Sequence, residues 1–204
     1  MSLQENWKLA GIGLWWQMHP FRTILCCSLI AASPSFAADD KAVRIPSPKG
    51  DLVLLVEQRT TGADTVKLEG VSGKEFLTFA VDDELKEGEV KNETVLWSPA
   101  SDGVAFAAGN KSMIQAFAFV RTTAGWKPLK LPVPGAEGKA LENPHVQPAK
   151  WQGKQLVLTI SGPHGGQAAA GTYAGTMTVE VDPEAGVAKK IEENISVSKN
   201  AESR

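Results

Sequence analysis

Short runs of apolar residues recur along most of the chain, and turn-forming residues close each of them. The clearest runs cover residues 52–56, 76–81, 104–107, 114–120, 156–160 and 176–181. They are rich in β-branched and aromatic residues and end at Gly, Pro, Asn or Asp, which is typical of strands. Polar and apolar residues alternate over 65–69 and 178–181, as in strands with one solvated face. The pattern predicts an all-β fold.

Turn glycines recur at nearly constant spacing and divide the chain into three units. A first set, spaced by 53 and 50 residues, consists of Gly50, Gly103 and Gly153. A second set follows the first by 23, 22 and 33 residues and consists of Gly73, Gly125 and Gly186. A glycine-rich loop over residues 161–171 accounts for the longer third interval. A period near 50 residues made of short strands is typical of propeller blades and related antiparallel β-meander arrays.

The spacing predicts one all-β domain over residues 38–197, followed by a polar tail. The tail, residues 198–204, is expected to be disordered because it holds too few apolar residues to pack. Within the domain, the expected units cover residues of about 43–91, 92–143 and 144–197.

The first 37 residues have the layout of a cleavable secretory signal. Arg22 precedes a ten-residue apolar run, residues 23–32, and a small-residue exit ends at Ala37. This layout predicts cleavage after Ala37 and a periplasmic or secreted mature protein. Met18 is favoured over the first methionine as the start, because it gives a basic region of ordinary length.

Charge and composition argue against several kinds of partner. Removal of Glu5, Lys8 and Arg22 with the leader leaves 22 acidic and 19 basic residues, a net charge of −3. No basic stripe with interleaved aromatics occurs, so no nucleic-acid surface is expected. Cys26 and Cys27 leave with the leader, so the fold has to be stable without disulfides. No later segment is long and apolar enough to span a membrane.

The second unit carries a recognisable motif at its first turn. Residues 97–106 resemble the W-S-P-D-G signature of WD40-like (PD40) repeats, with two additional residues, Ala100 and Ser101, inside the turn. The match is partial over residues 47–52 and poor in the third unit. The resemblance implies blades like those of the periplasmic TolB propeller, and with them a noncatalytic interaction module. Pro, Asp and Gly are also the residues that a tight turn requires.

Three units leave a propeller open, since propellers close with four or more blades. Unpaired strand edges recruit other chains. The sequence therefore favours one of two arrangements. Either the chain pairs with a second copy, giving a homodimer of six units, or it adopts a different closed fold such as a β-sandwich or an irregular barrel.

Residues with catalytic or metal-binding chemistry are scarce. The domain has two histidines, His145 and His164, and neither lies near Cys, His or carboxylate ligands at metal-site spacing. His145 lies in a proline-bounded segment and is interpreted as solvated. Paired carboxylates occur at 82–84 and 192–193; the first group begins a mixed Lys- and Glu-rich run and is interpreted as a solvated loop, and the chain has no calcium-loop motif. We therefore expect no catalytic set, no metal and no cofactor.

The glycine-rich loop is the first candidate for ligand contact, because insertions in repeat proteins gather on the binding face. Its paired glycines expose backbone N–H groups beside a histidine, but no G-x-S-x-G nucleophile motif accompanies them. A flexible hairpin insertion is favoured over catalysis. The residues predicted to contact a ligand are His164, Gly165, Gly166, Gln167 and Tyr173.

Two functions are consistent with these features. The favoured one is an exported, noncatalytic binding module of the cell envelope or periplasm, with a protein or saccharide partner of unknown identity. The alternative is a secreted hydrolase or carbohydrate-binding protein that uses the loop over residues 161–173. Trp97 and Trp151 lie at nearly equivalent repeat positions, which favours structural roles for them over sugar stacking.

Overall fold

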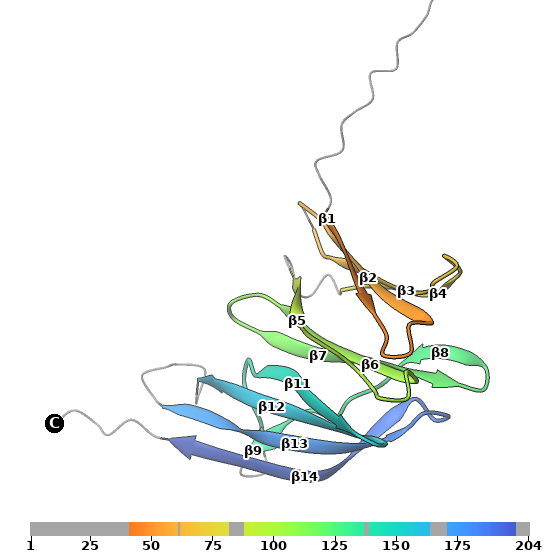
Figure 1. Ribbon diagram of the computed structural model, residues 1–204. Helices are drawn as coiled ribbons and strands as arrows, with labels where there is room; N and C mark the ends of the chain where they lie inside the picture. The colour runs from red at the N-terminus through yellow and green to blue at the C-terminus, as the bar shows by residue number, and fades with distance from the viewer. Residues whose placement is uncertain (1–40, 61, 82–87, 137–138, 164–170, 199–204) are drawn as a thin grey trace, which may run out of the picture. The chain divides into compact units, whose positions relative to one another are not determined.

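The computed structural model describes residues 41–60, 62–81, 88–136, 139–163 and 171–198 (Figure 1). All regular secondary structure within these ranges is β-strand, which confirms the predicted all-β fold. The described residues contain no helix that could cross a membrane. The leader predicted for residues 1–37 and the tail after residue 198 lie outside the described residues.

Consecutive strands pair antiparallel in three four-stranded meanders. The first contains β1 (Lys41–Pro46), β2 (Leu52–Gln58), β3 (Thr65–Gly70) and β4 (Glu75–Ala80). The second contains β5 (Glu89–Trp97), β6 (Gly103–Gly109), β7 (Ile114–Thr122) and β8 (Gly125–Pro128). The third contains β11 (His145–Gln152), β12 (Gln155–Pro163), β13 (Thr172–Asp182) and β14 (Val187–Ser198). All six predicted apolar runs lie in these strands or end one residue beyond them.

The linker after the second meander holds a minimal pair of strands, β9 (Gly135–Ala136) and β10 (Lys139–Ala140). A single parallel bridge between Ile114 of β7 and His145 of β11 joins the second and third meanders into one sheet. No sheet closes into a barrel within the described residues, so the irregular barrel is wrong, whereas both the antiparallel meander array and the β-sandwich are compatible with this topology.

The three meanders form layers with an apolar core in each gap (Figure 1). Leu54 and Val56 of β2 meet Phe106 and Phe119 of the second meander in the first core. The second core joins alanines of the second meander to a third-meander set that includes Leu156, Leu158, Ile160, Met177 and Val179. Each core therefore packs two neighbouring meanders against each other.

The second meander is buried on both faces, and its two faces carry different side chains. Successive residues of a strand point to opposite faces, so Phe106 faces the first core while Ala105 faces the second. In β7 the same alternation separates Phe117 and Phe119 from Ala118. Phe106 stacks on Phe117 with ring centroids 5.6 Å apart. The unbroken apolar run at 104–108 is explained by this two-sided burial.

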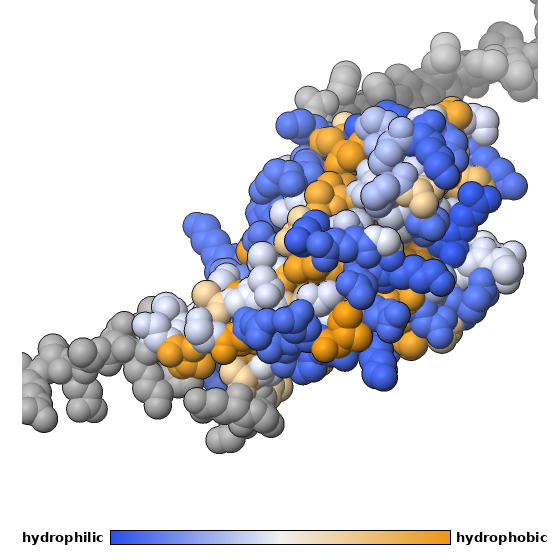
Figure 2. Space-filling model, turned by 60° about the horizontal axis from the view of Figure 1, so that its bottom comes forward, coloured by the Kyte–Doolittle hydropathy of each residue, from blue (hydrophilic) through white to orange (hydrophobic). Residues whose placement is uncertain are grey.

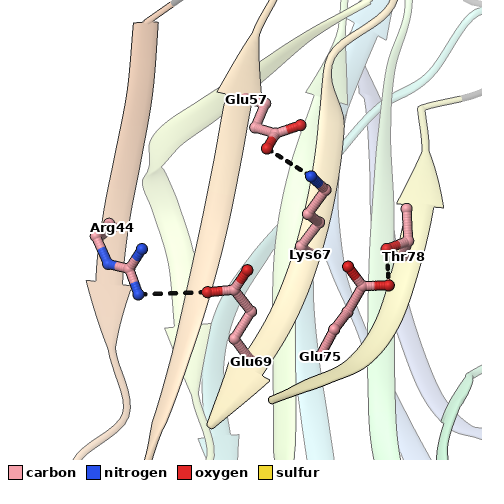
Figure 3. A network of polar contacts seen from close by, with 6 residues as sticks. All are labelled: Arg44, Glu57, Lys67, Glu69, Glu75 and Thr78. Atoms are coloured by element: carbon pink, nitrogen blue, oxygen red, sulfur yellow. Dashed lines mark hydrogen bonds and ion pairs between the residues drawn. The ribbon is translucent and has the colours of Figure 1, made fainter. Parts of the chain in front are cut away.

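The two outer faces of the stack carry mostly polar side chains, around a few apolar ones such as Val53, Leu55 and Val157. On the first meander, Arg44 pairs with Glu69 (N–O 3.3 Å) and Lys67 with Glu57 (2.6 Å), as Figure 3 shows. On the third meander, the register places Thr159, Thr176 and Asn194 side by side, facing away from the second core. Figure 2 shows hydrophilic residues interspersed with small groups of hydrophobic ones. Polar end faces are what a finite stack of repeats requires in water.

The two Ser-Pro turns share one hydrogen-bond arrangement. Ser47 Oγ donates to Asp51 Oδ1 (3.0 Å) and accepts the N–H of the first β2 residue (3.2 Å). Ser98 Oγ likewise donates to Asp102 Oδ1 (2.5 Å) and accepts the N–H of the first β6 residue (3.0 Å). Both serine side chains are buried, so the serine, more than the proline, organises each turn.

The structure corrects the sequence alignment of these two turns. Gly50 (φ 70°) is equivalent to Ser101 (φ 58°), while Gly103 begins β6 as Leu52 begins β2. The second turn therefore has the same length as the first. The match of Gly50 with Gly103 was wrong, because the equivalent residue, Ser101, lies two positions earlier. Ser101 tolerates the left-handed conformation that usually selects glycine, and its Oγ accepts the Lys49 N–H of the first turn (3.2 Å).

Directed hydrogen bonds supplement the cores at both junctions. Between the first and second meanders, the buried Asp64 carboxylate accepts the N–H of Val90 (2.8 Å). Between the second and third, Trp151 Nε1 donates to the carbonyl of Leu96 (3.1 Å). The Trp151 ring also covers Gly103, where an added Cβ would lie 3.0 Å from it. These contacts give Trp151 the structural role favoured from the sequence.

Removal of the Ser98 hydroxyl tests the turn arrangement. Ser98→Ala leaves the buried N–H of Gly103 without its acceptor, so we expect unfolding free energy to fall by about 1–3 kcal/mol. Ser196→Ala is the control, because Ser196 is exposed and donates to the Ala174 carbonyl on the outer face. Its effect should stay within about 0.5 kcal/mol. Urea unfolding measures both, and equal effects would contradict the turn's importance.

Candidate functional site

Most of the residues predicted to contact a ligand lie outside the described chain. His164, Gly165, Gly166 and Gln167 belong to the undescribed stretch between β12 and β13. Their ligand contact, and the hydrolase or carbohydrate-binding alternative that rests on it, stay predictions. The other histidine, His145, is half-buried at the start of β11, where it pairs with β7 and β12.

Tyr173, the fifth predicted residue, packs in the second core. Its side chain is buried, and its hydroxyl donates to the backbone carbonyl of Glu142 (3.0 Å). Burial raises the pKa of its phenol above the ordinary value. Gly162 lies opposite on β12, and a Cβ there would come within 2.3 Å of the phenol oxygen. The contacts of Tyr173 are therefore structural, and its predicted contact with a ligand stays a prediction.

The paired carboxylates at 192–193 lie in strand β14. Glu193 accepts the N–H of Gly135 (3.0 Å) and pairs with Lys190 (2.5 Å). The acidic group at 82–84 lies outside the described residues. Within the described part of the chain, no group of three or more potential metal ligands comes together.

An apolar groove of about 210 Å³ lies where the second and third meanders meet. Its floor is formed by Val146 and Leu158, both buried in the second core. Ala116 of β7 and Leu131 of the linker form its partly buried sides. The remaining lining residues are Gln115, Pro132, Val133, Pro134 and Pro144. The groove thus combines an apolar floor with rigid walls rich in proline.

The groove exists because the fourth strand of the second meander is short. β7 has nine residues, whereas β8 has four and pairs only with Phe119–Thr122. Proline cannot donate to a strand ladder, and Pro128, Pro132 and Pro134 follow one another here. The linker consequently leaves β7 before its first residues are covered. In the third meander, by contrast, β14 pairs with β13 from Thr172 to Asp182.

Two larger hollows in the described residues are lined by charged groups. One includes Arg59, Asp64 and Glu89, and the other includes Glu180 and Lys189 among its lining residues. Each carries charges of both signs. Ligand sites are usually apolar with a few polar groups, so the groove at β7 is the better candidate.

Comparison with protein-family models finds no match for this sequence, and comparison with curated proteins finds none either. The resemblance to WD40-like repeats therefore stays a prediction from residues 97–106. The groove has to be interpreted from its own chemistry.

Sequence reasoning missed the groove, although part of its signal is local. Four prolines, at positions 128, 132, 134 and 144, lie in the stretch from the end of β8 to the start of β11. They indicate that no long strand runs here. What the sequence does not give is the neighbour of this linker, since the pairing of β7 with β11 is a long-range contact.

The raised pKa of Tyr173 predicts a specific loss of stability in alkali. Tyr173 is the only tyrosine in the sequence, so tyrosinate absorbance reports on it alone. A pKa raised in the folded state gives stability that is complete below the unfolded value of about 10 and is lost as pH rises through the folded value. Phenylalanine has no ionisable hydroxyl, so we expect the unfolding free energy of Tyr173→Phe, measured with urea, not to show this alkaline decrease. Identical alkaline slopes for both proteins would contradict it.

Gly162 and Tyr173 should behave as a coupled pair. Gly162→Ala places a methyl group against the phenol oxygen, and we expect a loss of about 1–3 kcal/mol from overpacking. Adding Tyr173→Phe removes that oxygen, so the double variant should lose less than the sum of the two single variants. A double-mutant cycle from denaturant unfolding measures the difference. Additive losses would show that the phenol oxygen is not the cause.

Proposed function

We propose that this protein is an exported, noncatalytic binding module that captures a protein partner through the groove at β7. The observation that carries the proposal is an apolar groove with a buried floor, Val146 and Leu158, and proline-rich walls. Export is supported by the secretory-signal pattern of residues 1–37. The resemblance of residues 97–106 to interaction repeats agrees with a binding role.

The size and lining of the groove favour one apolar side chain. A dry cavity of about 150 Å³ holds a benzene molecule, so about 210 Å³ accommodates a single aliphatic or aromatic group. Among the described residues that line the groove, none carries an aromatic ring on which a sugar would stack. A protein side chain therefore suits this groove better than a saccharide.

The walls are suited to a preformed site. Pro132, Pro134 and Pro144 have fixed φ angles, so the linker loses little conformational freedom when a partner binds. Val133 lies between two of these prolines with 69% of its surface exposed. It forms the accessible rim, where a partner would make first contact.

A charge at the rim should weaken binding. We expect peptides selected from a random display library on the purified domain to share an apolar residue. Val133→Glu places a carboxylate beside the apolar groove and should weaken these peptides about tenfold or more, since burying an unpaired charge is costly. Fluorescence anisotropy measures the affinities.

Val71→Glu is the matched control for Val133→Glu. Val71 is 65% exposed, close to the 69% of Val133, and lies in the turn between β3 and β4. The peptides should bind Val71→Glu with unchanged affinity. Equal binding to both variants would place the peptide site elsewhere, and failure to enrich any peptide would count against a peptide-binding function.

A further inference from the structure

We propose that the partner binds as an extended strand that pairs antiparallel with the uncovered edge of β7 at Ala116, as β8 does further along the same edge, and places one apolar side chain in the groove. This inference rests on the proposed function for the location of the site. It adds the backbone conformation of the partner and the kind of residue that anchors it.

The two edges of β7 are covered to different extents. On one edge β6 is in register with β7 from Ile114 to Val120. On the other edge, β8 is in register with Phe119–Thr122, and β11 meets β7 at Ile114. Among the described residues, no strand is in register with 115–117 on this second edge. An interruption of the ladder therefore lies between β8 and β11.

The backbone of Ala116 points to the uncovered edge. Ala118 O accepts the N–H of Leu129 on the β8 side (2.8 Å), whereas Arg121 N–H donates to Asp102 O on the β6 side (2.8 Å). The N–H and C=O groups of every second residue in a strand point to the same edge. Ala116 is two residues from Ala118, so its donor and acceptor face the β8 side, where an unpaired ladder position is a template for another strand.

The side chain of Ala116 explains why backbone pairing and groove filling go together. Ala116 packs against the second core and lines the groove. Residues directly opposite in paired strands have their side chains on the same face. A partner residue opposite Ala116 would therefore direct its side chain toward Val146 and Leu158 on the floor. Because alanine is small, it leaves room for that side chain.

The interruption of the ladder between β8 and β11 has room for a short segment only. From Ile114 to Ala118 is four residues, or roughly 13 Å at 3.3 Å per residue. This length suits about three extended residues, of which the central one pairs with Ala116. The central residue has to be apolar to fill the groove, and it cannot be proline because its N–H is needed. The partner is thus an extended protein segment with an apolar, non-proline residue at its centre.

N-methylation of the bound peptide tests this geometry without altering the protein. The probe is a peptide selected on the domain, synthesised with a methyl group on the backbone nitrogen of its central apolar residue. Loss of the hydrogen bond to Ala116 and the crowding of the methyl group should weaken binding about tenfold or more. The matched control carries the methyl group on the adjacent residue, whose N–H faces away, and should bind within about twofold of the parent.

Amide hydrogen exchange provides an independent readout. We expect the Ala116 amide to exchange more slowly when the parent peptide is bound, while the Val104 amide, within the β5–β6–β7 pairing, stays unchanged. Strand pairing is overturned if both methylated peptides bind like the parent and Ala116 exchange does not slow. The proposed function would survive that result if Val133→Glu still weakened binding about tenfold or more. If no peptide binds the domain, both proposals are overturned.

Discussion

Burial of the middle meander on both faces is the constraint on which the rest of this structure depends. Its β6 and β7 strands present phenylalanines to the first meander and alanines to the third. A large side chain on one face and a small one on the other allow both neighbours to approach the same sheet. Neither outer meander has a second apolar face of this kind, so each depends on the middle sheet for its core.

The same constraint explains the location of the groove. Alanines on the third-meander side bring the two layers close, but the short β8 strand and the proline-rich linker leave part of that contact uncovered. The second core is therefore open at one point, beside Ala116, while the first core is supported by its phenylalanine contacts. The candidate site is thus a gap in the packing between the second and third meanders, which is continuous elsewhere.

The sequence predicted the apolar strands well and the polar strands poorly. Runs such as 104–107 and 156–160 identified β6 and β12, whereas polar strands such as β5 and β14 gave no apolar run. Edge strands carry charged residues because one edge faces water, so hydrophobicity does not reveal them. Ser101 misled the turn alignment because it holds a conformation usually assigned to glycine. The groove depends on the long-range approach of β11 to β7, which no local pattern encodes.

The polar end faces have a consequence for how this architecture can change in length. A copy of the middle meander inserted between its neighbours would present an apolar face on each side and could continue the array. A copy of the first meander added outside it would have to bury the Arg44–Glu69 and Lys67–Glu57 pairs, whose desolvation is costly. If such a protein grows by duplication, we therefore expect new repeats to be inserted between the first and the third meanders, which remain the terminal repeats.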